Sequence, residues 1–291
     1  MRCESARTSR SKGLPAGLAK GRAKSLSLVA AAVLVPGLAS CGLSIGDKDA
    51  LVVAASPVPH AEIINYVKEH LAARVGLKLE VREFTDFTTP NLATDEGSVD
   101  VNYFQNKPYL DDFNKERGTH VVPVVNVQLE PFGLYSKKIK SVDELAKGNT
   151  IGLPNDTVNE ARALQLLESK GIIKLRDGAG TSATPNDIVK NPKNLRFKEL
   201  EAAGVSRAMD DVEGVMLNGN YAFQAGLKPS KDALVLESPK NNPYTNFIAV
   251  KAGHENDPRV RKLAKLLNSD EVKRFIERKY QGSVLPAFGK P

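Results

Sequence analysis

The hydrophobic and polar positions of this chain alternate between strand spacing and helix spacing from residue 51 onward. Leu51–Ala55 is a continuous apolar run, typical of a buried strand, and Ser56–Pro59 ends it. A helix is predicted from about His60, because apolar residues then recur every three or four positions as far as Gly76. Residues 77–84 alternate between apolar and polar side chains, which predicts a second strand.

The same rhythm continues to the end of the chain. We predict further strands at 99–102, 120–127, 134–136, 150–153, 195–200, 214–218, 233–237 and 246–250. Helices are predicted at 108–117, 158–170, 204–210, 219–226, 258–268 and 270–280. Residues 177–194 are rich in Gly, Ser, Thr, Pro and Asn, so we expect mostly loop there.

This alternation predicts an α/β fold with right-handed crossovers and mainly parallel sheets. About ten strands in roughly 240 residues are too many for one doubly wound sheet, so we expect two lobes. The chain is expected to cross between the lobes at Glu130–Gly133 and in the turn-rich segment 238–243. Residues 50–130 and 244–291 would then form one lobe, and residues 131–243 the other.

The first 40 residues have the features of a secretion signal. Basic residues precede the apolar run 26–38, which is short for a membrane-spanning helix and has the length of a signal-peptide core. The sequence Leu38-Ala39-Ser40-Cys41 follows and resembles a bacterial lipobox, which implies cleavage after Ser40 and acylation of Cys41. An ordinary signal peptide with an incidental cysteine is the alternative. Residues 41–49 are predicted to be a lipid-anchored tether.

The charge of the chain is concentrated in the same N-terminal segment. The full sequence carries a net charge of +7, but residues 1–40 hold seven basic side chains and one acidic side chain. The remainder has 34 basic and 33 acidic residues, so the folded part is nearly neutral. We therefore expect no nucleic-acid partner.

The sequence does not support catalysis, a metal site or a cofactor. The four histidines lack metal-site spacing, and each is expected to be a surface or capping residue; they are His60, His70, His120 and His254. No G-x-S-x-G elbow, no S-x-x-K set with its companion motifs and no Walker sequence is present. Acidic residues are plentiful but scattered, so no carboxylate pair can be singled out.

Side chains suited to recognising a small molecule lie where predicted strands end. The stretch 100–111 runs from a strand into a helix whose first turn contains Pro108. Ligands of α/β proteins lie beyond the carboxyl ends of the strands. By strand alternation, Tyr103 and Gln105 are expected to point away from the face of Phe104. The candidate binding residues are Phe87, Phe104, Asn106, Tyr109, Asn159, Arg162, Asn218, Asn220 and Asn246, with Tyr244 beside the last.

Each of these residues also has a purely structural interpretation. The guanidinium group of Arg162 could hold a carboxylate through two parallel hydrogen bonds, or it could be a solvated helix arginine. The asparagines could recognise a ligand, or they could be helix caps and turn formers. The aromatic residues of the stretch 100–111 could equally belong to the core.

At these residues the chain resembles the NlpA lipoprotein family, the methionine-binding lipoproteins of ABC importers. The resemblance extends over nearly all of residues 51–288. It rests on the segments Ser56–Ile63, Asp100–Asp111, Tyr135–Ser141, Pro154–Asp156 and Asn191–Leu195, together with the lipobox. It implies a two-lobed, periplasmic-binding-protein-like fold of type II, with a ligand cleft between the lobes.

The resemblance also implies roles for the candidate residues. Arg162 would bind the carboxylate of the ligand, and four asparagines would surround its charged groups: Asn159, Asn218, Asn220 and Asn246. The rings of Phe87, Phe104 and Tyr109 would enclose its side chain. Many members of the family have a histidine at the position of Asn106, so the identity of the ligand is expected to depend most on this residue.

The implied function is capture of L-methionine or a similar amino acid and its delivery to the permease and ATPase complex of an ABC importer. A lipid anchor on Cys41 would hold the protein at the extracytoplasmic face of the cell membrane. The alternatives are a binding protein for another amino acid or a dipeptide, an extracytoplasmic enzyme, and an adhesin or scaffold. A paired histidine or acid in the cleft would favour an enzyme, and a large exposed apolar patch would favour an adhesin.

Overall fold

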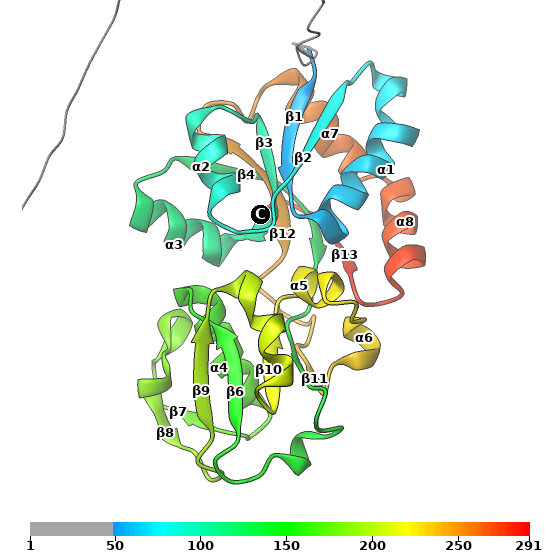
Figure 1. The fold of residues 1–291 in the computed structure, drawn as a ribbon. Helices are drawn as coiled ribbons and strands as arrows, with labels where there is room; N and C mark the ends of the chain where they lie inside the picture. The colour runs from blue at the N-terminus through cyan, green and yellow to red at the C-terminus, as the bar shows by residue number, and fades with distance from the viewer. Residues whose placement is uncertain (1–48) are drawn as a thin grey trace, which may run out of the picture. The chain divides into compact units, whose positions relative to one another are not determined.

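The computed structural model describes residues 49–291, and these fold into two lobes, each built on its own mixed sheet (Figure 1). The predicted signal peptide and Cys41 lie outside the described residues. The first lobe contains both the beginning and the end of the described chain, and the second lobe contains its middle (Figure 1).

The sheet of the first lobe has six strands in the order β13-β4-β12-β3-β1-β2. Its strands are β1 (Leu51–Ala55), β2 (Leu79–Glu83), β3 (Val101–Asn106), β4 (Val121–Leu129), β12 (Asn246–Lys251) and β13 (Leu285–Gly289). The strand β1 runs parallel to β2 and β3, whereas β12 runs antiparallel to β3 and β4. All six residues of β3 are buried, because this strand lies inside the sheet and helices cover both faces.

Helices pack on both faces of this first sheet (Figure 1). One side carries α1 (Glu62–His70), α7 (Pro258–Leu267) and α8 (Asp270–Tyr280), whose buried apolar residues join those of the strands in the largest core cluster. The other side carries α2 (Thr89–Glu96) and α3 (Lys107–Arg117), with two smaller apolar clusters.

The sheet of the second lobe has five strands in the order β11-β5-β10-β6-β9. They are β5 (Gly133–Tyr135), β6 (Thr150–Pro154), β9 (Arg196–Leu200), β10 (Gly214–Leu217) and β11 (Val235–Leu236). The helix α4 (Thr157–Ser169) packs on one face, and α5 (Gly219–Gln224) with the 3-10 segment Ala202–Asp210 packs on the other. The second lobe also contains the short helix α6 (Pro229–Asp232) and the hairpin of β7 (Lys174–Leu175) and β8 (Ile188–Lys190).

The chain passes between the two sheets twice. It leaves the first sheet after β4 and enters the second at β5, through residues 130–132. It returns between β11 and β12, through residues 237–245. Both passages fall in the stretches that interrupt the strand and helix pattern of the sequence.

Several expectations about the fold were wrong. The sheets are mixed rather than mainly parallel. In the first sheet β12 runs antiparallel to β3 and β4, and in the second β5 runs antiparallel to β10 and β11. The sequence pattern also missed α2, α6 and β13, which contain several polar residues, Pro or Gly and show no clear apolar period. Finally, the helix expected at 204–210 is a 3-10 segment that begins two residues earlier.

Candidate functional site

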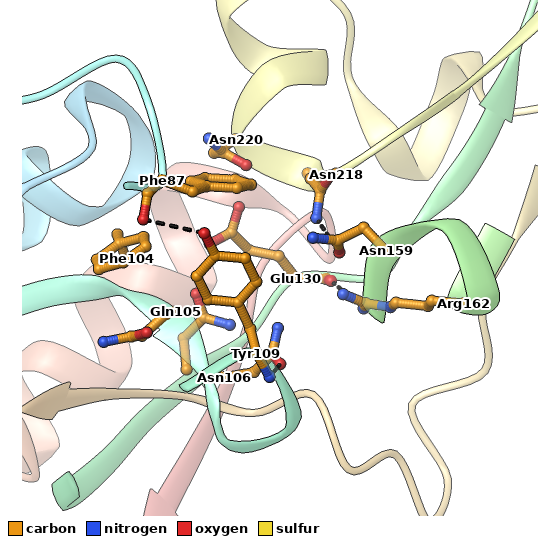
Figure 2. A pocket seen from close by; sticks show the side chains of 12 residues that line it. Phe87, Phe104, Gln105, Asn106, Tyr109, Glu130, Asn159, Arg162, Asn218 and Asn220 are labelled. Carbon is orange, nitrogen blue, oxygen red and sulfur yellow. Dashed lines mark hydrogen bonds between the residues drawn. The ribbon is translucent and has the colours of Figure 1, made fainter. Parts of the chain in front are cut away.

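A cavity lies where the two lobes meet. The first lobe contributes the end of β3, the first turn of α3 and the loop that follows β2. The second lobe contributes the beginnings of α4 and α5. The lining residues (Figure 2) are Phe87, Phe104, Gln105, Asn106, Tyr109, Glu130, Asn159, Arg162, Asn218, Gly219, Asn220 and Asn246. All nine candidate binding residues therefore surround one cavity.

Aromatic rings form one wall of the cavity. The centroid of the Phe87 ring lies 5.7 Å from that of Phe104 and 5.8 Å from that of Tyr109. The Tyr109 hydroxyl donates a hydrogen bond of 3.1 Å to the Phe87 carbonyl (Figure 2). From the second lobe, the Tyr221 ring lies 4.9 Å from that of Phe87, and its hydroxyl donates to the Thr85 carbonyl at 3.1 Å. These contacts join the lobes beside the cavity and provide a surface suited to an apolar side chain.

Gln105 lines the cavity, although strand alternation predicted it on the opposite face. The reason is an irregularity in the pairing of β3 with β12. Asn246 pairs with Asn106, whereas Ile248 pairs with Tyr103, so three steps along β3 match two along β12. Such a bulge interrupts the alternation of side chains. The last three residues of β3 consequently all reach the cavity.

Asn106 is both a helix cap and a lining residue. Its Oδ1 atom accepts a hydrogen bond of 3.2 Å from the backbone N–H of Tyr109, which caps α3. Its strand partner Asn246 accepts a hydrogen bond from His60 Nε2 at 2.8 Å and donates one to the Tyr244 carbonyl at 3.1 Å. The two asparagines are therefore held in place by neighbouring groups at the same end of the sheet.

Arg162 is buried and already paired with a carboxylate of the protein. Its Nε and Nη2 atoms donate to the two Glu237 carboxylate oxygens at 3.0 and 2.6 Å, and Nη2 also donates to the Glu130 carbonyl at 3.2 Å. Tyr244 stacks on its guanidinium group, with 4.0 Å to the ring centroid. Although burial raises the pKa of Glu237, the charge and hydrogen bonds of Arg162 hold it below its usual value. The solvated interpretation of Arg162 is thus wrong.

The asparagines of the second lobe form a chain of hydrogen bonds. The Nδ2 atom of Asn159 donates to Asp156 at 2.9 Å, and its Oδ1 atom accepts from Asn218 Nδ2 at 2.8 Å. Burial raises the pKa of Asp156, and the hydrogen bonds from Asn159 oppose this shift. Among residues 49–291, the buried atoms Asn218 Oδ1 and Asn220 Nδ2 find no hydrogen-bond partner. These two atoms are therefore free to accept or donate a hydrogen bond to a molecule in the cavity.

The sequence pattern did not predict a buried cluster around Glu130. Glu130 is 5% exposed, and its Oε1 atom lies 3.0 Å from His60 Nε2 and 2.8 Å from Gln128 Nε2. His60 is 1% exposed, so its assignment as a surface or capping residue was wrong. The other three histidines are exposed. The interruption of the pattern at Glu130 was the available signal, but nothing in the sequence connects it with a residue 70 positions earlier.

Within residues 49–291, no group of three or more His, Cys, Asp and Glu side chains could hold a metal ion. None of the helices in this part of the chain is long and apolar enough to cross a membrane.

Comparisons with known proteins agree with one another. The family model described as NlpA lipoprotein matches residues 51–288. The methionine-binding lipoprotein MetQ of Bacillus subtilis is 43% identical over 256 residues, which cover 86% of this chain and 93% of that protein. A nutrient-binding protein from Burkholderia cenocepacia, solved with bound methionine, is 43% identical with a TM-score of 0.79, over 82% of this chain and 100% of its own. A periplasmic substrate-binding protein of an ABC transporter from Coxiella burnetii is 40% identical with a TM-score of 0.78, over 81% and 100%.

Proposed function

Because this chain belongs to the NlpA lipoprotein family, we propose that it is a lipid-anchored solute-binding protein that captures methionine, or a close analogue, for an ABC importer. The observation that carries this proposal is the composition of the cavity. A buried arginine, an aromatic wall and unpaired asparagine atoms meet in one space between two lobes. A free amino acid with an apolar side chain has groups that match all three.

Arg162 binds the ligand carboxylate in this proposal. Glu237 and the Glu130 carbonyl occupy its Nε and Nη2 atoms, so the remaining terminal nitrogen, Nη1, meets the ligand. This differs from the two parallel bonds to the ligand that the sequence suggested. Glu237 fixes the guanidinium plane and balances its charge, which allows an arginine to stay buried before the ligand arrives.

The aromatic wall receives the ligand side chain. Phe87, Phe104 and Tyr109 hold their rings within about 6 Å of one another. A thioether sulfur beside an aromatic ring gains roughly 0.3–1.5 kcal/mol per contact, which favours methionine over an aliphatic side chain of similar size. Asn106 lies at the edge of this wall and is the residue whose substitution should change ligand preference.

The two lobes close around the ligand. We place residues 50–130 with 244–291 in one moving body and residues 131–243 in the other, with the hinge in the two crossing segments. The hydrogen bond from Tyr221 to the Thr85 carbonyl and the contact of the Tyr221 and Phe87 rings then form only on closure. Closure removes water from the cavity and strengthens every polar contact inside it.

Cys41 carries the lipid anchor in this proposal and holds the protein at the extracytoplasmic face of the cell membrane. Its partner there is the permease and ATPase complex of the importer. The function is binding and delivery rather than catalysis. A histidine–carboxylate pair does lie at the cleft, but the proteins that resemble this chain over most of its length are named as binding proteins, which supports binding over catalysis.

Titration calorimetry of the purified protein with L-methionine tests this proposal. Arg162→Ala should weaken binding by at least about 30-fold, because a buried charge loses its partner. Arg259→Ala is the matched control, since Arg259 also pairs with carboxylates but lies away from the cavity. A panel of other amino acids and dipeptides completes the test. Heat from one of these and none from methionine would refute the substrate, and unchanged binding by Arg162→Ala would refute the carboxylate contact.

A further inference from the structure

We propose that Glu130 pairs with the α-ammonium group of the ligand, so that a free amino group is a requirement for binding. This inference rests on the proposed function in one respect, namely that the ligand is an amino acid. It comes from a buried carboxylate that lines the cavity (Figure 2). The protein holds one of its oxygens, and the other has no hydrogen-bond partner among the described residues.

The first oxygen of Glu130 is fixed by two donors. Gln128 Nε2 donates to Oε1 at 2.8 Å, and His60 Nε2 lies 3.0 Å from the same atom. His60 Nε2 also lies 2.8 Å from Asn246 Oδ1, which accepts as well, so this nitrogen carries the hydrogen. The Tyr103 ring packs edge-on against the imidazole at 4.6 Å. The carboxylate is therefore preorganised by neighbours that are themselves buried.

The second oxygen of Glu130 faces the second lobe. A Cβ atom built on Gly219 would lie 2.9 Å from Oε2 and 2.8 Å from Glu130 Cβ, so the start of α5 rests directly on this side chain. Oε2 finds no hydrogen-bond partner within residues 49–291. Asn218 Oδ1, in the residue before Gly219, is the other unpaired acceptor of the lining. Two acceptors of this kind suit the three N–H groups of an ammonium ion.

The charges in the cavity point to the same assignment. Glu237 already balances the charge of Arg162 through two short contacts. Among the described side chains, Glu130 has only His60 within ion-pair distance, and no Lys or Arg. A buried carboxylate without a cation is costly, and a ligand ammonium would relieve that cost. The arginine and the glutamate thus separate the two ends of a zwitterion.

A ligand comparison on the wild-type protein gives the first test. Calorimetry with L-methionine and with its desamino analogue, 4-methylthiobutanoate, changes only the amino group. We expect the analogue to bind at least about 30-fold more weakly, as for the loss of one partner of a buried charge pair. Equal affinity for the two compounds would overturn the assignment of Glu130 without any variant.

The variant Glu130→Gln gives the second test, because it keeps the shape and removes the charge. Methionine binding should weaken at least about 30-fold, whereas binding of the desamino analogue should change less than about five-fold. Glu62→Gln is the control, since Glu62 is a partly buried carboxylate that pairs with Lys279 away from the cavity. An equal loss for both ligands would mean that Glu130 only supports the fold, and would overturn the inference.

The two proposals fail in different ways. If methionine gives no heat but another amino acid does, the substrate assignment fails. The same comparison, between that amino acid and its own desamino acid, then still decides the role of Glu130. If methionine binds and its amino group makes no difference, the substrate assignment stands and the role of Glu130 is refuted.

Discussion

Gly219 is the position where a single methyl group should test the closed arrangement of the lobes. The residue begins α5, where alanine is intrinsically the better helix former by up to about 1 kcal/mol. Its added Cβ, however, would lie 2.8 Å from Glu130 Cβ and 2.9 Å from Oε2, closer than real atoms approach. The Glu130 side chain cannot easily move away, because His60 and Gln128 hold its other carboxylate oxygen, Oε1. Helix propensity and packing therefore predict opposite effects of Gly219→Ala.

Packing should decide the outcome. Inserting a methyl group into a filled interior typically costs about 1–3 kcal/mol, which corresponds to roughly a 5- to 150-fold weaker affinity if the contact forms only on closure. We expect Gly219→Ala to lower methionine affinity in this range by calorimetry, with little change in the melting temperature of the ligand-free protein. Gly204→Ala is the control, because its Cβ would meet only the flexible end of Arg207 at 3.2 Å. Wild-type affinity in Gly219→Ala would refute the close approach of α5 to Glu130.

Two further predictions concern other parts of the chain. Burial and the charges of Glu199 and Asp156 raise the pKa of Glu160 to about 7 in the folded protein. In the unfolded chain the pKa of a glutamate is about 4.3. Ionisation of Glu160 therefore destabilises the folded protein progressively as the pH rises from about 4.3 to about 7. Glu160→Gln should therefore melt at a higher temperature than the wild type at pH 8 and at about the same temperature at pH 4. A larger increase in melting temperature at pH 4 than at pH 8 would contradict this predicted pH dependence. Cys41→Ala should release the full-length protein from membranes in cell fractionation, and a variant that stays in the membrane fraction would rule out acylation as the anchor.

The sequence predicts the fold best where apolar periodicity and breakers agree. The segment from Leu51 to residue 84 was predicted as a strand, a helix that ends at Gly76 and a second strand. The structure confirms both strands, but the predicted helix divides into α1 (Glu62–His70) and a 3-10 helix, Ala72–Val75, before Gly76. The strand β13 escaped prediction because Pro286 and Gly289 interrupt its apolar residues. The antiparallel direction of β12 was not predicted either, because it depends on how the chain returns from the second lobe to the first sheet.

The positions of the candidate residues were predictable because each lies in or near one end of a strand, and such ends converge in α/β folds. Their partners were not predictable. Arg162 pairs with Glu237, which lies 75 positions later in the sequence, and His60 contacts Glu130, which lies 70 positions later. Contacts of this kind leave no local pattern. Gln105 was placed on the wrong face of β3, because a one-residue bulge changes the face toward which a strand residue points.

A crystal structure with selenomethionine bound to protein that contains ordinary methionine would test the central claim most directly. The anomalous signal of selenium locates the side chain of the ligand without reference to the rest of the density. We expect a single peak against the rings of Phe87, Phe104 and Tyr109, with the ligand carboxylate at Arg162 and its amino group at Glu130. A peak on the asparagine side of the cavity, or none inside it, would contradict the account.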